Sequence, residues 1–364
     1  MPSIQPISSS TADSPQQAAG SARVGSWMER PVVFWVVALA ASVQFAIVYV
    51  RTVALEFPFD RYAYADVEYP YRRRVLMQWV LRAALHFRSY LTYSSRNSSW
   101  GPVEICCVLV AVVSLLATIA IARRWIQLLA GGRSGLEWLS LLVIWICNYH
   151  FLLAEIRFQL PYDLPSMAFF GLGCYAAYTR NRLLYYAALL VGTVNRESTL
   201  FLPLVFLLFS TSEAAPLLQT LRRIPLGLYA ETLLQFALWA AIYLWCVRST
   251  GGSRDLPSLL AVNARMILKP VHWTTYASIF GFLWIPYVAY FRRIGDARLQ
   301  RLAWLAPLWA IIMFVFADPL EIRTHSEWAV YLVVCLACIA RSFQALPGGA
   351  GAEPGDPLQA SPSL

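Results

Sequence analysis

Long apolar runs separated by short polar stretches fill most of this chain, and they decide what it can fold into. Hydrophobic residues make up 59% and charged residues 13% of the 364 positions, whereas soluble domains carry about 25% charged residues. A helix needs about 20 apolar residues to cross a membrane. The sequence therefore predicts an all-α, polytopic integral membrane protein with apolar runs near residues 32–50, 103–122, 136–154, 164–179, 183–194, 198–210, 228–247, 274–290, 303–317 and 328–340.

Two of these runs, 183–194 and 198–210, are too short to cross a membrane separately. They flank the tripeptide Asn195-Arg196-Glu197. Charge at the centre of a lipid-facing helix is costly, while a polar turn that lines a wet cavity is tolerated. We therefore favour two short helices that turn at the tripeptide over one continuous helix. This gives about ten transmembrane or partly spanning helices, with both ends of the chain on the same side.

The two ends of the chain are polar and show no apolar period. Residues 1–26 are rich in Ser, Gln, Ala and Pro, and residues 344–364 contain Pro-Gly-Gly with scattered Pro and Ser. Such composition is typical of disordered tails. The sequence predicts a disordered cytoplasmic tail at each end of one multi-helix membrane domain, residues 27–343.

Arginine sets the predicted orientation. The chain has 28 arginines and one lysine, and basic residues in short loops mark the cytoplasmic side. We place both termini there, as in a bacterial inner-membrane protein, because the tails share a side with the arginine-bearing connections 123–133, 180–182, 222–223 and 292–301. The opposite loop 51–102 holds eight arginines against this rule. Either the topology differs there, or an anionic ligand requires them.

Four polar clusters interrupt the apolar pattern, and each combines carboxylates with arginine. A central Arg or Asp costs roughly 2.5–3.5 kcal/mol on membrane-insertion scales, so repeated charges at the ends of apolar runs indicate a polar site. The predicted topology puts all four clusters on the outer side, where they can converge. They are Glu56 to Arg74, Glu155 to Asp163, Asn195 to Glu197, and Asp318 to Glu327.

The first outer loop is the richest of these clusters. Asp60 and Asp66 lie among aromatic residues and are followed by the arginines 72–74. Residues 75–87 are then apolar on one face and too short to span, which is typical of a helix lying in the membrane interface. The loop can supply a carboxylate base beside an arginine cradle for a lipid-linked phosphate. It can also be an aromatic belt with snorkelling arginines, but that alternative leaves the aspartates unexplained.

The short acidic and aromatic first outer loop, the interfacial helix and the outward turn between two short helices resemble the GT-C superfamily of polytopic glycosyltransferases. The likeness covers the arrangement of roughly residues 30–210. It implies a polyprenyl-phosphate sugar donor, a catalytic base at Asp60 with Asp66 as its competitor, and a donor-phosphate contact at the turn of residues 195–197. The chain departs from the family pattern because its loop lacks the Asp-Glu or Glu-Asp pair, and it has no Asp-x-Asp.

Sugar transfer with inversion needs a base for the acceptor hydroxyl and cations for the departing phosphate. Asp60 or Asp66 can supply the base. Glu155–Arg157 and Glu321–Arg323 can instead be structural ion pairs that hold helix ends together. No cofactor or metal ligand set is expected, although the sequence does not exclude a divalent metal. The predicted substrate-binding residues are Arg72, Arg74, Glu155, Arg157, Asp163, Asn195, Arg196, Glu197, Glu321, Arg323 and His325.

The sequence thus favours a membrane glycosyltransferase that moves a sugar from a polyprenyl-phosphate donor to an acceptor on the extracytoplasmic face. Its expected partners are the lipid-linked donor and membrane lipids; nucleic acid is not expected, because there is no soluble basic domain to hold it. A transporter or flippase and an outer-face polymerase of lipid-linked glycans remain alternatives. Carriers usually repeat their broken helices in both halves, and no such repeat is apparent here.

Overall fold

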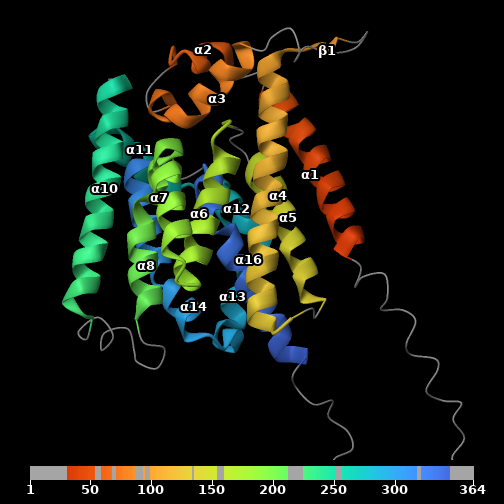
Figure 1. The fold of residues 1–364 in the computed structure, drawn as a ribbon, viewed down its shortest axis with the longest axis vertical. Helices are drawn as coiled ribbons and strands as arrows, with labels where there is room; N and C mark the ends of the chain where they lie inside the picture. Colours follow the sequence, from red (N-terminus) through yellow and green to blue (C-terminus); the bar gives the residue numbers. More distant parts are fainter. Residues whose placement is uncertain are drawn as a thin grey trace, which may run out of the picture.

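The computed structural model describes residues 31–53, 59–67, 71–86, 93–94, 99–132, 135–153, 160–211, 224–250, 256–317 and 321–344. These residues form a helical bundle (Figure 1), and the predicted all-α class is confirmed apart from one pair of two-residue strands. The strands β1 (Tyr93–Ser94) and β2 (Ser99–Trp100) are antiparallel, with Tyr93 opposite Trp100. The predicted tails lie outside the described residues except for Gln344, which is the last residue of α16 (Ala329–Gln344).

Within the described residues, five helical segments are long and apolar enough to cross a membrane. Two further apolar segments, Leu136–Leu152 and Glu197–Ser210, are shorter, and the expected count of about ten spans is not confirmed. The five segments correspond to α1 (Pro31–Val53), α4 (Pro102–Ala130), α10 (Leu226–Thr250), α14 (Ala297–Leu302) with α15 (Leu305–Phe316), and the 3₁₀ segment Ile322–Trp328 with α16 (Ala329–Gln344).

A backbone break explains why one predicted run does not form a spanning helix. Phe280, Gly281 and Phe282 all have positive φ, at 57°, 60° and 65°, which is incompatible with a continuous right-handed helix. The run 274–290 is therefore divided into α12 (Trp273–Ala277), a short 3₁₀ turn and α13 (Trp284–Ala289).

The bundle has two ends that are defined by short helices. At one end α2 (Phe59–Ala63) and α3 (Val75–His86) lie across the tops of the longer helices (Figure 1); we call this the α3 end. At the other end, which we call the α14 end, α14 lies near the last turns of α16 (Figure 1). The prediction of a helix at 75–87 is confirmed over residues 75–86, and α3 has one buried face formed by Val75, Met77, Gln78, Leu81 and Ala84.

The predicted turn between two short helices is confirmed. Helix α7 (Arg182–Asn195) ends at Arg196, whose backbone is extended at φ −160° and ψ 143°, and the chain returns through a 3₁₀ turn into α8 (Leu202–Ser210). The two arms lie side by side. The Oγ1 atoms of Thr193 and Thr199 are 2.8 Å apart, and the rings of Tyr185 and Phe206 are 5.0 Å apart. The tripeptide therefore forms the tip of a hairpin.

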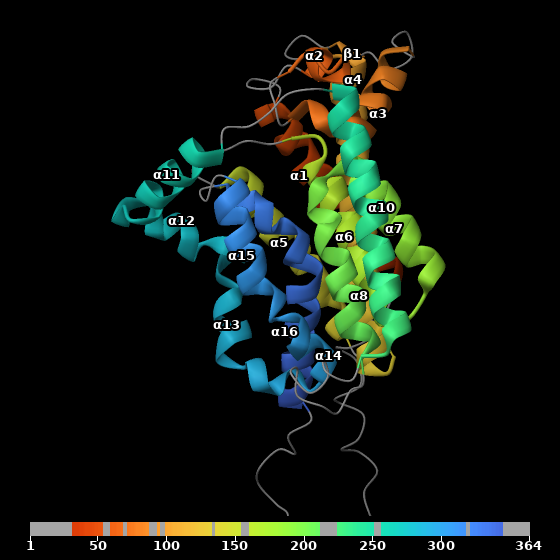
Figure 2. The same ribbon diagram turned by 90° about the vertical axis from the view of Figure 1, so that its left-hand side faces the viewer.

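Helix α6 (Asp163–Tyr178) is the central element of the bundle (Figure 2), and most of its residues are buried. Small residues let its neighbours approach closely, as is common in membrane helix packing. A Cβ atom on Gly171 would come within 2.6 Å of Val330 in α16, and one on Gly173 within 2.7 Å of Leu202 in α8. These close contacts hold α6 between α8 of the hairpin and α16.

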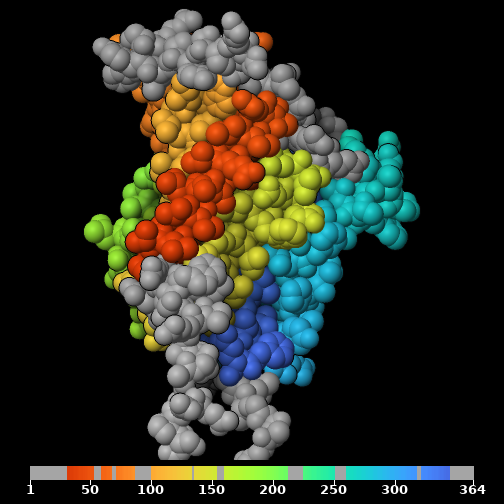
Figure 3. Space-filling view, turned by 90° about the vertical axis from the view of Figure 1, so that its right-hand side faces the viewer, coloured from red at the N-terminus to blue at the C-terminus, as the bar shows by residue number. Residues whose placement is uncertain are grey.

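The remaining helices cover the sides of this centre. Helix α1 runs obliquely across one face beside α5 (Leu142–Cys147), as Figure 3 shows. Helices α11 (Leu256–Ile267) and α12 stand off another side, next to α15 (Figure 2). The Nδ2 atom of Asn263 in α11 donates hydrogen bonds to the carbonyl oxygens of Phe314 and Ala317, at 2.6 and 2.7 Å.

Candidate functional site

A fully buried carboxylate, that of Asp163, lies in the first turn of α6 at the α3 end. Arg323 Nη1 donates to both of its oxygens, at 3.0 and 2.8 Å, and Arg196 Nη1 lies 3.3 Å from Oδ1. The exposed fractions of the three side chains are 0%, 3% and 5%. The start of a helix also favours a negative charge. One carboxylate thus joins the hairpin tip to the segment before α16.

Two further carboxylates complete this cluster. Arg196 Nη1 forms an ion pair of 2.9 Å with Glu327 Oε1, which also accepts a hydrogen bond of 2.9 Å from the Ser198 hydroxyl. Arg323 Nη2 donates to Glu321 Oε2 at 2.9 Å, so the ion pair expected within residues 321–323 is formed. We call Asp163, Arg196, Glu321, Arg323 and Glu327 the Asp163 network. Its three carboxylates face two guanidinium groups.

A second ion pair, between Arg74 and Glu197, lies beside the network. Arg74 Nη2 donates to Glu197 Oε1 at 3.1 Å, and its guanidinium stands 4.0 Å above the ring of Tyr162. Burial lowers the pKa of Arg74, but Glu197, Tyr162 and Asp163 together outweigh burial and raise that pKa above its ordinary value. The Glu197 side chain is 36% exposed. Its side chain is therefore more accessible than those of Asp163 and Glu327, which are fully buried.

Several buried polar atoms around these pairs have no hydrogen-bond partner among the described residues. They are Arg74 Nη1, the Tyr162 hydroxyl, Asn195 Oδ1 and Glu327 Oε2. Asn195 uses its other amide atom, Nδ2, to donate to the Tyr162 carbonyl at 2.9 Å and to Ser166 Oγ at 2.8 Å. Buried polar atoms normally find a partner in protein or ordered water. The cluster thus has spare capacity for water or for a ligand.

Helix α10 adds an aromatic side to the site. The rings of Trp239 and Tyr243 are stacked, with centroids 5.0 Å apart and planes 8° apart. Trp239 Nε1 donates to the Glu197 carbonyl at 3.2 Å, and Arg73 Nη1 donates to the Tyr243 hydroxyl. Sequence analysis missed both rings, because a Trp and a Tyr inside an apolar run carry no sign of where they point. Their spacing of four residues, which puts them on one helix face, was the available signal.

The two aspartates predicted as catalytic lie apart from the Asp163 network. Asp60 is exposed on α2 and makes no ion pair or hydrogen bond with any residue in the described ranges. Asp66 is exposed and accepts a hydrogen bond of 2.9 Å from Arg61, which lowers the pKa of its carboxyl. Helix α2 is nevertheless held near the site, because the Tyr62 hydroxyl donates to the Arg74 carbonyl at 2.8 Å.

The structure places two of the other predicted residues, Arg72 and His325, and does not describe two more, Glu155 and Arg157. Arg72 is half-buried, and its carbonyl accepts a hydrogen bond of 2.7 Å from Gln78, while its Nε atom is buried without a partner in the described part of the chain. His325 is half-buried beside the network. Glu155 and Arg157 lie outside the described residues, so their proposed pairing stays a prediction. The sequence analysis named Glu327 only as the end of a cluster and did not include it in the site.

Within the described ranges no group of three or more His, Cys, Asp or Glu side chains is placed to hold a metal ion. Comparison with known proteins gives no match: no family model, no curated protein and no solved structure is significantly similar to this chain. The functional argument therefore rests on the residues of the site.

The charge balance of the Asp163 network yields a stability prediction. Arg323→Gln leaves Glu321 without its partner and Asp163 with one weaker contact, and an unpaired buried charge costs about 3–5 kcal/mol. We expect the Arg323→Gln variant to unfold in detergent at a markedly lower temperature than the wild type. Tryptophan fluorescence during heating measures this temperature. Adding Asp163→Asn removes one of the two negative charges that Arg323 contacted and should recover part of the loss.

The matched control is Arg61→Gln, which breaks an exposed pair with Asp66 and should leave the unfolding temperature unchanged, since such pairs contribute little. A wild-type unfolding temperature for Arg323→Gln would show that the network does not hold the bundle together.

Proposed function

We propose that this protein is a membrane glycosyltransferase that uses a polyprenyl-phosphate sugar donor at the α3 end of the bundle. The observation that carries the proposal is the convergence there of Arg74 and Glu197 with the Asp163 network, below the helix that bears Asp60. Such a concentration of charge is unfavourable in an apolar bundle unless it serves a polar task. A phosphate head group at the membrane surface, with its prenyl chain in lipid, fits that position.

The donor phosphate in this proposal is bound by Arg72 and Arg74. Both have a buried guanidinium nitrogen without a partner among the described residues, Nε in Arg72 and Nη1 in Arg74. Arginine suits this task because its planar fork matches phosphate oxygens. Arg196 was expected to reach the phosphate too, but it is engaged by Asp163 and Glu327. We therefore assign it the role of holding the hairpin tip in place.

The catalytic base in this proposal is Asp60. Its competitor Asp66 accepts a hydrogen bond from Arg61, and its lowered pKa makes it a weaker base. Asp60 lies two residues before Tyr62, whose hydroxyl is bound to the Arg74 carbonyl. The base would take the proton of the acceptor hydroxyl while the arginines stabilise the leaving phosphate. The stacked rings of Trp239 and Tyr243 offer an apolar face for a sugar ring.

The orientation of the bundle is part of the same proposal: the α3 end faces outward, and both termini lie in the cytoplasm of a bacterial cell. Cysteine in place of Tyr64, which is 65% exposed beside α2, should react with a membrane-impermeant maleimide added to intact cells. Cysteine in place of Arg292, exposed at the α14 end, should react only after the membrane is opened. The reverse labelling pattern would put the site on the cytoplasmic side and remove its access to an outer-face acceptor.

Replacing the proposed base tests the reaction itself. Asp60→Asn keeps shape and hydrogen bonding but cannot accept a proton, so transfer should fall at least about a hundredfold, the usual contribution of a general base. Binding of the donor should be unchanged, as expected for a group that acts in the transition state. The measurement is sugar transfer in proteoliposomes from a panel of radiolabelled polyprenyl-phosphate sugars.

Asp66→Asn is the matched control and should retain near wild-type transfer. An active Asp60→Asn with an inactive Asp66→Asn would assign the base to Asp66 instead. A wild-type protein that transfers no sugar but moves the labelled lipid across the bilayer would contradict the transferase and favour a flippase.

A further inference from the structure

A cavity bounded by described residues, which has no part in the proposed reaction, lies at the α14 end. Its volume is about 590 Å³, which is within the range of about 300–1,000 Å³ typical of small-molecule sites. Three segments distant in sequence form its wall. They are the end of α4 at Leu129, residues 293–297 between α13 and α14, and the last turns of α16 at Cys338, Arg341 and Ser342.

The charge of the wall is positive. Arg293 and Arg341 face one carboxylate, Asp296, among the lining residues. That carboxylate is already engaged, because it accepts backbone hydrogen bonds from Arg298 and Leu299, at 2.8 and 3.1 Å, and one of 2.6 Å from the Tyr178 hydroxyl. Asp296 therefore caps α14, and it forms its ion pair, at 3.6 Å, with Arg298 rather than with Arg293 or Arg341.

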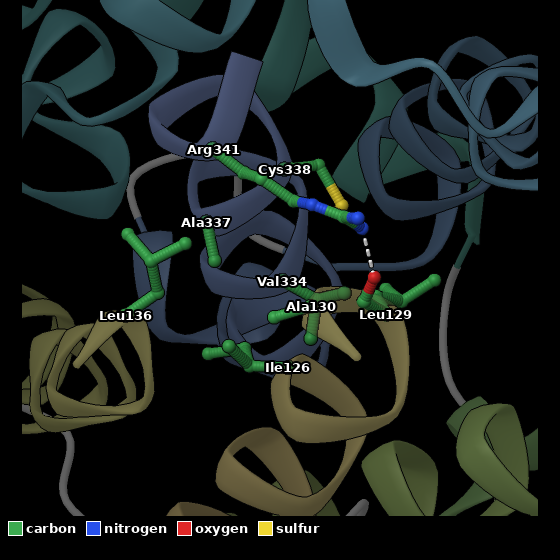
Figure 4. A pocket seen from close by; sticks show the side chains of 8 residues that line it. All are labelled: Ile126, Leu129, Ala130, Leu136, Val334, Ala337, Cys338 and Arg341. Carbon is green, nitrogen blue, oxygen red and sulfur yellow. Dashed lines mark hydrogen bonds between the residues drawn. The ribbon is translucent and has the colours of Figure 1, made fainter. Parts of the chain in front are cut away.

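Both guanidinium groups are held in place and keep donors to spare. Arg341 Nη1 donates to the Leu129 carbonyl (Figure 4), and the Arg293 guanidinium lies 4.3 Å from the ring of Phe343. An arginine has five N–H donors, so these contacts leave several for an anion. Figure 4 shows Arg341 next to Cys338, where both residues line a second pocket. The volume of this pocket is about 10 Å³, which is enough for about one water molecule. Arg341 therefore lines both this small pocket and the larger cavity.

The cavity also has an apolar flank. Tyr290 and Phe343 are each 43% exposed, and their rings pack edge to face with centroids 5.1 Å apart, next to Arg293. A ligand that combines a phosphate with an acyl chain can therefore place the phosphate between the arginines and the chain along these rings. Basic pockets between membrane helices are general binding sites for anionic lipid head groups.

We propose that this cavity is a phosphate-binding site at the α14 end, formed by Arg293 and Arg341, whose ligand is the head group of an anionic phospholipid. The site is distant from the Asp163 network and does not depend on the proposed transferase activity. A free phosphate has the same chemistry as the head group, and the test separates the two sources.

The test uses the purified, delipidated full chain and native mass spectrometry, which counts bound lipids. We expect phosphatidylglycerol to be retained by the wild type and phosphatidylcholine not to be. Arg341→Gln and Arg293→Gln should each weaken phosphatidylglycerol binding by about fivefold or more, since an arginine near an anionic head group contributes about that factor. Arg292→Gln is the matched control: it is exposed next to Arg293 but does not line the cavity, and it should bind like the wild type.

Inorganic phosphate is the second probe. If added phosphate does not displace bound phosphatidylglycerol, the ligand is the lipid. If added phosphate displaces phosphatidylglycerol from the wild type, and this displacement requires Arg341, the site binds an anion but its ligand is soluble phosphate. If Arg341→Gln fails to fold because its bond to Leu129 is lost, Arg293→Gln carries the test. The proposal would be overturned if Arg292→Gln and Arg293→Gln lost phosphatidylglycerol binding equally. It would also be overturned if neither Arg293→Gln nor Arg341→Gln lost binding.

Discussion

The pairing of the buried Asp163 carboxylate with Arg196 and Arg323 is the interaction on which the rest of the structure depends. A carboxylate inside an apolar bundle is tolerated only if it is paired and hydrogen-bonded. Its partners come from the tip of the α7–α8 hairpin and from the segment before α16. Satisfying one charge therefore requires three distant segments to meet at the same end of the molecule, and this meeting defines the candidate site.

The network divides the charged residues into two kinds. Arg196 and Arg323 are engaged by carboxylates on several sides, so they hold the architecture. Arg74 and Glu197 are paired with each other at the edge of the network, where Glu197 remains 36% exposed. Buried ion pairs add little net stability compared with apolar packing. We infer that the inner charges fix the geometry and that the outer pair and its surroundings are available to a ligand.

Sequence reasoning predicted the helical class, the helix that forms at residues 75–86 and the hairpin at residues 195–197, because charges placed at the ends of apolar runs are a strong physical signal. It did not predict the number of spanning helices, since the break at residues 280–282 depends on backbone conformations that a single glycine only hints at. It also missed Trp239 and Tyr243, because an aromatic residue in an apolar run can face lipid or protein equally well. The predicted base Asp60 lies outside the network.

The central claim is that the α3 end binds a lipid-linked phosphate through the arginines that precede α3. The most direct measurement is an experimental structure of the protein in a lipid nanodisc with added polyprenyl phosphate. The account predicts phosphate density within hydrogen-bonding distance of Arg72 or Arg74, on the side of the Arg74–Glu197 pair that faces α10. Polyprenyl phosphate bound elsewhere, with the Arg74–Glu197 pair intact and no density beside it, would contradict the claim.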